Sequence, residues 1–280
     1  MSDQTDDTEV DMVDRLNLSV PHSARVYDYF LGGKTNFAPD RAVAEHLLEA
    51  FPGFRTAAQS NRMWMHRAAR YVAEQGITQF LDIGTGIPTS PNLHEVVQEV
   101  VPEANVVYVD NDPIVLTHSR ALLVSKPQGK TAYLEADITD PQAILDSDEV
   151  REVLDLSKPV ALSIVGVFHY LPDEAKPYEL LQQLVDALAP GSYLLFSHCT
   201  PDFAPEMWEQ AIQVYKADGG DAQVRSREEI ERFFAGLELV DPGVEVPYRW
   251  HPDAETERLV ENDTFNDISC SLWVGVGKKP

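Results

Sequence analysis

The stretch that decides the fold reads QFLDIGTGIP and covers residues 79–88. It begins as an apolar strand and breaks at Gly84 and Gly86, two glycines separated by one residue. A helix-forming run from Leu93 to Val101 follows, with either Asn92 or Ser90 as its N-cap. Glycines let a ligand approach the backbone, and the first amides of a helix are free donors. The stretch therefore predicts an α/β fold with a nucleotide site after its first strand.

The glycine turn by itself leaves the choice of nucleotide open. The pattern that binds NAD has a third glycine three residues after the second, and that position is Thr89 here. Pro88 also removes one amide from any pyrophosphate cradle. S-adenosylmethionine has no phosphate and tolerates a shorter turn.

Composition narrows the class of protein. The formal net charge of −24 over 280 residues repels phosphate backbones, so we expect no nucleic-acid partner. The two cysteines, Cys199 and Cys270, have no metal spacing, and we expect no metal. The sequence shows neither a signal peptide nor an apolar run of membrane-spanning length, so we expect a cytoplasmic protein with no membrane partner.

The chain divides into three parts. Residues 1–18 are acidic and are expected to be disordered. Residues 19–76 are expected to form a helical N-terminal cap, with helices at about 23–31, 39–50 and 56–74. Residues 77–280 are expected to form the nucleotide-binding domain. The cap can close over the carboxyl edge of its sheet.

Strand and helix patterns alternate through the third part. Strands are expected at 79–83, 105–110, 130–135, 159–165 and 192–197, with helices between them, including one at 141–154. Short strand candidates lie at 237–240 and 244–247, and the last strand, 269–277, is expected to be antiparallel. Strands alternating with helices predict a parallel sheet whose ligand crevice lies at the carboxyl ends of the strands. An antiparallel last strand suits a methyltransferase sheet better than a dinucleotide-binding one.

Acidic residues follow the second and third strands. Asp110 can accept hydrogen bonds from both ribose hydroxyls of an adenosine, and Asp112 is the better N-cap for the next helix. Asp137 can accept the exocyclic amine of adenine while Ile138 packs on the ring; the alternative for Asp137 is an Asx-turn. Two acids so placed suit S-adenosylmethionine.

The sequence also resembles a known family. The motif LDIGTG at 81–86 resembles motif I of class I S-adenosylmethionine-dependent methyltransferases. YDYFLGGKTNF at 27–37 is similar to the hallmark of an actinobacterial family of S-adenosyl methyltransferases of unknown acceptor. Residues 61–62, 79–89, 107–113 and 272–277 match the same family. The resemblance implies a Rossmann-like class I fold with a seven-stranded, mostly parallel sheet, an antiparallel last strand and an S-adenosylmethionine site.

Three residues of the cap region are further candidates for the cofactor. Tyr29 is a candidate for facing the pocket, and Lys34 and Arg62 are candidates for the cofactor carboxylate. A surface position is the alternative for Lys34 and Arg62. The predicted cofactor-binding residues are therefore Asp82, Gly84, Thr85, Gly86, Asp110, Asn111, Asp137, Ile138, Gly166, Val167, Tyr29, Lys34 and Arg62.

The chemistry of methyl transfer is expected above the fourth and fifth strands. His169 follows the fourth strand and is the candidate general base, with a packing role as the alternative. For His198, at the end of the fifth strand, a structural role is expected.

The sequence thus predicts an S-adenosylmethionine-dependent methyltransferase that acts on an unidentified small-molecule acceptor by in-line transfer. A non-catalytic S-adenosylmethionine-binding or regulatory protein is the first alternative. An NAD(P)-dependent oxidoreductase is the second, and Pro88 argues against it.

Overall fold

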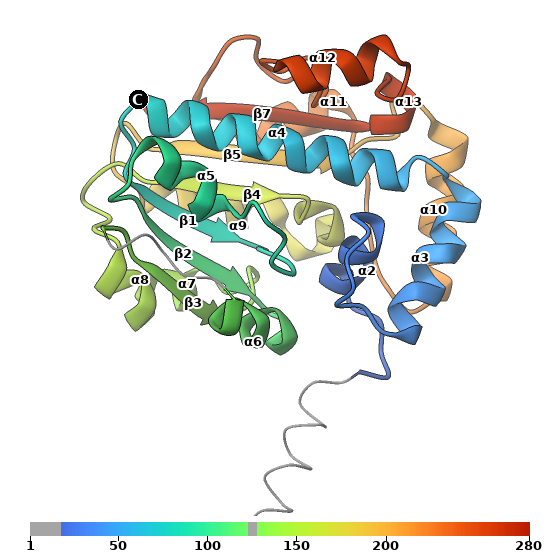
Figure 1. Cartoon of the computed structure of the whole chain (residues 1–280), viewed down its shortest axis with the longest axis horizontal. Coiled ribbons are helices and arrows are strands. Elements are labelled where there is room, and N and C mark those ends of the chain that lie inside the picture. The colour runs from blue at the N-terminus through green and yellow to red at the C-terminus, as the bar shows by residue number, and fades with distance from the viewer. Residues whose placement is uncertain (1–17, 123–127) are drawn as a thin grey trace, which may run out of the picture.

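A computed structural model describes residues 18–122 and 128–280 of the chain. Its centre is a sheet of seven strands within these residues, in the order β3-β2-β1-β4-β5-β7-β6 (Figure 1). The first five strands are parallel, β7 is antiparallel to β5, and β6 is antiparallel to β7. The strands are β1 (Gln79–Ile83), β2 (Asn105–Asp110), β3 (Thr131–Glu135), β4 (Ala161–Val165), β5 (Tyr193–Cys199), β6 (Glu238–Leu239) and β7 (Leu272–Lys278). The predicted mostly parallel sheet with an antiparallel last strand is confirmed.

Helices cover both faces of the sheet, as the apolar central strands require. On one face, Phe80, Val106 and Tyr108 pack with apolar residues of α4 (Phe54–Glu74) and α5 (Leu93–Val100). On the other face, Leu81 and Val107 pack with helices between β3 and β6. These helices are α7 (Pro141–Asp146), α8 (Asp148–Val153), α9 (Pro177–Asp186) and α11 (Arg227–Glu231).

The three N-terminal helices lie in different parts of the molecule. Most of α4 belongs to the helix layer that covers the sheet. In contrast, α2 (Ser23–Phe30) and α3 (Ala38–Ala50) lie beyond the carboxyl ends of the strands, beside α10 (Pro205–Ala217) (Figure 1). Val26, Phe30, Leu47 and Trp208 share one buried apolar cluster there. Helices α2, α3 and α10 therefore form what we call the roof, over the carboxyl ends of the strands. The predicted division of the chain at residue 76 stays a prediction.

Several boundaries differ from those predicted. The helix expected at 141–154 is two helices, because the Ser147 hydroxyl accepts a hydrogen bond from the Val150 amide and starts a new helix. The strand expected at 269–277 begins only at Leu272. The preceding residues form α13 (Asp267–Cys270), which ends at Ser271 in the left-handed region.

Other elements complete the described chain. Residues 244–247 form no strand, and only Glu245 makes an isolated bridge, to Val274. Helix α12 (Ala254–Glu261) was not predicted from the sequence, and α6 (Pro113–Leu122) runs up to the undescribed residues 123–127. The predicted disorder of the N-terminus falls almost wholly on residues 1–17, outside the described part. No helix in the described residues is long and apolar enough to span a membrane.

Candidate active site

A cavity of about 300 Å³ lies at the carboxyl ends of β1, β2, β3 and β4, and we call it the polar cavity. Its volume is within the range of roughly 300–1,000 Å³ that is usual for ligand pockets. Eleven of the predicted cofactor residues line it: Asp82, Gly84, Thr85, Gly86, Asp110, Asn111, Asp137, Ile138, Gly166, Val167 and Arg62. The cavity is also lined by residues that the sequence analysis did not predict: His22, Ser23, Ala24, Tyr27, Met65, Thr139, Val165, Tyr170 and Leu171.

The backbone conformation and the close packing of the turn at residues 84–86 favour glycine. Gly84 and Gly86 have φ angles of +75° and +69°, which favour glycine. A Cβ on Gly84 would lie 2.2 Å from a methyl carbon of Val167. The amides of Gly84 and Thr85 both donate to the Val109 carbonyl, at 2.8 and 3.2 Å, which fixes the turn against β2. The turn therefore keeps its backbone at the cavity wall.

Asp110 connects the glycine turn to the start of α6. Its side chain is 5 % exposed, and it accepts hydrogen bonds from the amides of Gly86 (2.8 Å) and Asp112 (3.0 Å). Asp112 is the helix cap, as predicted, because it accepts from the Ile114 amide at 2.9 Å. Each carboxylate oxygen of Asp110 has a second acceptor position left for a ligand. Burial raises the pKa of this carboxyl group.

Asp137 makes the Asx-turn that was its alternative role, and it also lines the cavity. One carboxylate oxygen accepts from the amide and hydroxyl of Thr139, at 2.8 and 2.7 Å. The other accepts from the Asn111 side chain at 2.8 Å. Burial acts to raise the pKa of Asp137, but these hydrogen bonds outweigh it and hold the pKa below its ordinary value. The residue is therefore ionised at neutral pH.

Arg62 of α4 and Asp82 of β1 also line the polar cavity, and β1 lies two strands along the sheet from β3, which Asp137 follows. The Arg62 guanidinium group donates to the backbone carbonyls of Thr89 and Pro91, the second at 2.9 Å, so it holds the loop between the glycine turn and α5. Burial lowers the pKa of Arg62 and raises that of Asp82 to about 6. The Asp82 carboxyl group therefore changes charge within the range in which proteins are assayed.

Two predicted cofactor residues do not line the polar cavity. The Tyr29 hydroxyl donates to Glu45 at 3.2 Å, and its ring lies under Arg55, while Lys34 is exposed. Helix geometry explains the position of Tyr29, since Tyr27 and Tyr29 point to different faces of α2 and Tyr27 is the one that faces the cavity. Tyr27 lines the cavity in its place.

The loop that carries Lys34 folds back onto α2. Asp28 accepts hydrogen bonds from the Thr35 amide (2.9 Å) and from the Asn36 side chain (2.8 Å). A Cβ on Gly33 would lie 2.0 Å from an Asp28 carboxylate oxygen, which explains the second glycine of the pair. Much of the motif at 27–37 therefore builds the roof and does not line the cavity.

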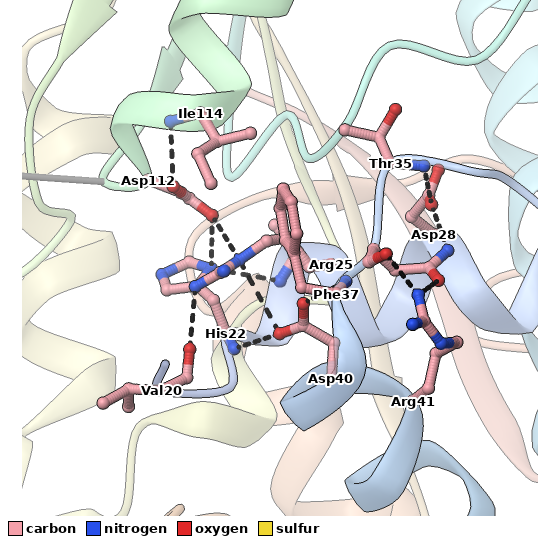
Figure 2. A network of polar contacts seen from close by, with 12 residues as sticks. Val20, His22, Arg25, Asp28, Thr35, Phe37, Asp40, Arg41, Asp112 and Ile114 are labelled. Carbon is pink, nitrogen blue, oxygen red and sulfur yellow. Dashed lines mark hydrogen bonds and ion pairs between the residues drawn. The ribbon is translucent and has the colours of Figure 1, made fainter. Parts of the chain in front are cut away.

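Buried ion pairs hold the roof against the sheet edge (Figure 2). Arg25 of α2 lies 3.1 Å from Asp112 and 3.7 Å from Asp40, and all three side chains are almost fully buried. The His22 amide donates to Asp40 at 2.9 Å, and the His22 ring lies 3.3 Å from Asp112. Because Asp112 follows Asp110 so closely, this network connects the position of the roof with the wall of the polar cavity.

A second cavity, of about 70 Å³, adjoins the first, and we call it the apolar cavity. The two cavities share the lining residues Tyr27, Gly166 and Tyr170. No Asp, Glu, Lys or Arg of the described chain lines the apolar cavity. Its walls come from α2, α3, the start of α4, the segment after β4, and α10, and they include the aromatic residues Phe30, Phe54, His169, Trp208 and Tyr215.

His169 lies in the wall of the apolar cavity, in a short 3₁₀ helix (Phe168–Tyr170) that follows β4. Its Nδ1 atom is buried without a hydrogen-bond partner among the described residues. Burial, with the nearby charge of Arg225, lowers the pKa of His169 to about 3, so the ring is neutral at pH 7.

His198 has the structural role that was predicted for it. Its Nδ1 atom lies 2.7 Å from the Cys199 carbonyl, and its Nε2 atom lies 3.0 Å from the Arg225 guanidinium group. The ring therefore donates at Nδ1 and accepts at Nε2, and both nitrogens are used within the fold.

Comparison with known proteins gives the family. A family model described as S-adenosyl methyltransferase matches residues 9–280. The chain belongs to this family. The predicted family and its cofactor, S-adenosylmethionine, are thereby confirmed, while the acceptor is not identified.

Two solved structures resemble the S-adenosyl methyltransferase chain along almost its whole length. A DUF574 family protein from Streptomyces avermitilis is 45 % identical, with a TM-score of 0.90, over 95 % of this chain and 100 % of that one. A methyltransferase candidate from Thermobifida fusca is 42 % identical, with a TM-score of 0.85, over 94 % and 97 % of the two chains.

Two further matches are less similar to this chain. The plantazolicin methyltransferase BpumL is 13 % identical, with a TM-score of 0.52 over 92 % of this chain and 95 % of that one, and it shows a similar fold. A curated Josephin-like protein from Arabidopsis thaliana is 30 % identical over 175 residues. That match covers 55 % of this chain and 45 % of the relative, so the chain spans less than half of that relative's length.

Proposed function

We propose that this S-adenosyl methyltransferase binds S-adenosylmethionine in the polar cavity and transfers its methyl group to a small-molecule acceptor in the apolar cavity. The observation that carries the proposal is that the two cavities meet at Tyr27, Gly166 and Tyr170. One cavity has carboxylates and a glycine turn, and the other has almost entirely apolar walls. A polar, partly cationic cofactor and an apolar acceptor can therefore lie side by side.

The polar cavity offers a partner for each part of the cofactor. Asp110 would accept from the ribose hydroxyls, and Asp137 and Ile138 would hold the adenine. Asp82 would face the amino group, and Arg62 is the cation available to the carboxylate. Bound there, the cofactor supplies a methyl group on a positively charged sulfur, and the protein contributes alignment and exclusion of water.

Nucleotide binding is the first test. Calorimetric titration with S-adenosylmethionine, S-adenosylhomocysteine and NAD should show binding of the first two and none of NAD. Binding of NAD alone would overturn the proposal in favour of an oxidoreductase.

His169→Ala provides the test of methyl transfer, once an acceptor is in hand. If His169 accepts a proton from the acceptor, its loss should lower kcat about 10²–10⁴-fold while the affinity for S-adenosylhomocysteine changes little. A large loss of affinity instead would make His169 part of the cofactor wall. If S-adenosylmethionine binds but no methyl leaves it with any acceptor, a non-catalytic binding role replaces catalysis.

A further inference from the structure

Besides the Nδ1 atom of His169, the apolar cavity has a hydrogen-bonding group on Asn61 that the described part of the fold leaves unused. Asn61 of α4 lines the cavity and is 2 % exposed. Its Oδ1 atom is buried and has no hydrogen-bond partner among the described residues. A buried carbonyl oxygen without a partner is costly and rare, so its position against a cavity needs an explanation.

The neighbours of Asn61 fix which way its amide group points. The Tyr27 hydroxyl donates its proton to the Ala58 carbonyl at 3.0 Å, so it can only accept from Asn61. The Asn61 nitrogen therefore lies toward Tyr27, at 3.3 Å. The free atom is consequently an acceptor, and a group that binds beside it must be a donor.

Asn61 lies close to the place where the two cavities meet. A Cβ built on Gly166, which lines both cavities, would be 3.2 Å from the Asn61 nitrogen and 3.9 Å from the His169 Cε1 atom. Asn61 and His169 therefore flank Gly166. The Oδ1 atom of Asn61 and the Nδ1 atom of His169 are both buried without a hydrogen-bond partner among the described residues, and both residues line the apolar cavity beside Gly166.

We propose that the apolar cavity selects a small, uncharged aromatic acceptor whose reacting O–H or N–H group donates a hydrogen bond to Asn61. This assignment rests on the proposed function and specifies its substrate class. The aromatic walls favour a ring, and the absence of charged groups from the described lining disfavours an ion.

The size of the apolar cavity limits the ring. An engineered cavity of roughly 150 Å³ binds benzene, and the apolar cavity measures about 70 Å³. The volume disfavours a fused ring system, and a single ring would lie partly in the opening that is shared with the polar cavity. Its reacting edge then points toward the cofactor.

The transfer balances with the groups present. The acceptor oxygen or nitrogen forms a bond to the methyl carbon while the carbon–sulfur bond breaks, and that electron pair stays on sulfur. The proton of the acceptor, hydrogen-bonded to the Asn61 oxygen before transfer, moves to the His169 imidazole as the new bond forms, because an amide oxygen is too weak a base to take it. One positive charge is lost from sulfur and one is gained by the imidazole, so the net charge of the site does not change.

Fluorinated probes test the assignment without turnover. Fluorine NMR would follow 4-fluorophenol and 4-fluoroaniline with protein saturated by S-adenosylhomocysteine. The controls are 4-fluoroanisole, which has no donor, and 4-fluorobenzoate, which is charged. We expect the two donors to bind roughly threefold to tenfold more tightly than the anisole, as one neutral hydrogen bond predicts, and no binding of the benzoate.

Two variants connect the effect to this cavity. Asn61→Leu should abolish the preference for the phenol over the anisole. Ala211→Leu, in the buried wall, should weaken all ring binding, and the exposed Ala187→Leu should not. S-adenosylhomocysteine affinity, measured on every variant, shows that each one is folded.

Three results would overturn the assignment while leaving the proposed function intact: equal binding of phenol and anisole, binding of the benzoate, or no ring binding at all to protein that binds S-adenosylhomocysteine. If S-adenosylhomocysteine itself does not bind, the proposed function fails, and the acceptor assignment fails with it.

Discussion

At the scale of single residues, the carboxylates of the polar cavity differ in environment and therefore in charge. Asp137 is held ionised by three hydrogen bonds, whereas burial raises the pKa of Asp82 to about 6. Asp110 already accepts from two backbone amides before any ligand binds. We therefore expect each carboxylate to respond differently to mutation or to a change in pH.

The raised pKa of Asp82 predicts a pH-dependent affinity. The carboxylate is ionised above about pH 6 and neutral below it. If it faces the cofactor amino group, the affinity for S-adenosylmethionine should fall as the pH is lowered from 7 to 5. Titration calorimetry across this range would measure the effect. Asp82→Asn should bind more weakly at pH 7 and should lose the pH dependence, and a variant with an unchanged pH profile would exclude Asp82 from the contact.

Asp110→Ala should impair both binding and folding. It removes a proposed ribose partner and leaves the half-buried Gly86 amide and the buried Asp112 amide without an acceptor, at a cost of about 1–3 kcal/mol for the buried one. We expect a loss of S-adenosylhomocysteine affinity of at least tenfold and a lower Tm. Calorimetry and thermal denaturation measure the two effects separately. An unchanged affinity in a destabilised protein would leave Asp110 with a structural role alone.

At the scale of elements, the roof depends on α2 and its buried ion pairs with the start of α6. Arg25→Ala leaves Asp112 and Asp40 buried without their cation, which should destabilise the protein by about 3–5 kcal/mol. Because Asp112 lies next to the polar cavity, we also expect weaker S-adenosylhomocysteine binding. Denaturant unfolding measures the first effect and calorimetry the second.

The control for this variant is an exposed ion pair between α4 and α5. Arg70→Ala breaks the pair with Glu99, at 3.2 Å between exposed side chains, and should change stability by less than about 1 kcal/mol. If Arg25→Ala is as mild as Arg70→Ala, the network in Figure 2 does not hold the roof.

At the scale of the whole molecule, the polar cavity joins the strands of the sheet to the roof. A ligand that contacts both should therefore stabilise the entire fold. At 100 times its Kd, S-adenosylhomocysteine should add about 2.7 kcal/mol and raise Tm by a few degrees. Thermal denaturation with NAD as the matched nucleotide should show no rise. A rise with NAD and none with S-adenosylhomocysteine would contradict the cofactor assignment.

The sequence by itself determined the alternation of strands and helices along the chain, and it predicted a ligand site at the carboxyl ends of the strands, where the structure has the polar cavity. These features follow from local patterns: apolar runs that need burial, glycines that tolerate positive φ, and acids directly after β2 and β3. The capping box of Asn92 with Glu95, one of two caps left open, is equally local. The predicted boundaries of two elements were wrong where a single residue caps a helix. Ser147 begins α8, and Ser271 ends α13.

Only the tertiary structure decided which side chains meet. It placed Tyr27 at both cavities instead of Tyr29, and it tied Arg62 to the loop after the glycine turn. It also assembled the apolar cavity from Asn61, His169 and Trp208, which lie on elements far apart in the chain. Such contacts depend on how helices pack over the sheet edge, and no short stretch of sequence contains that information.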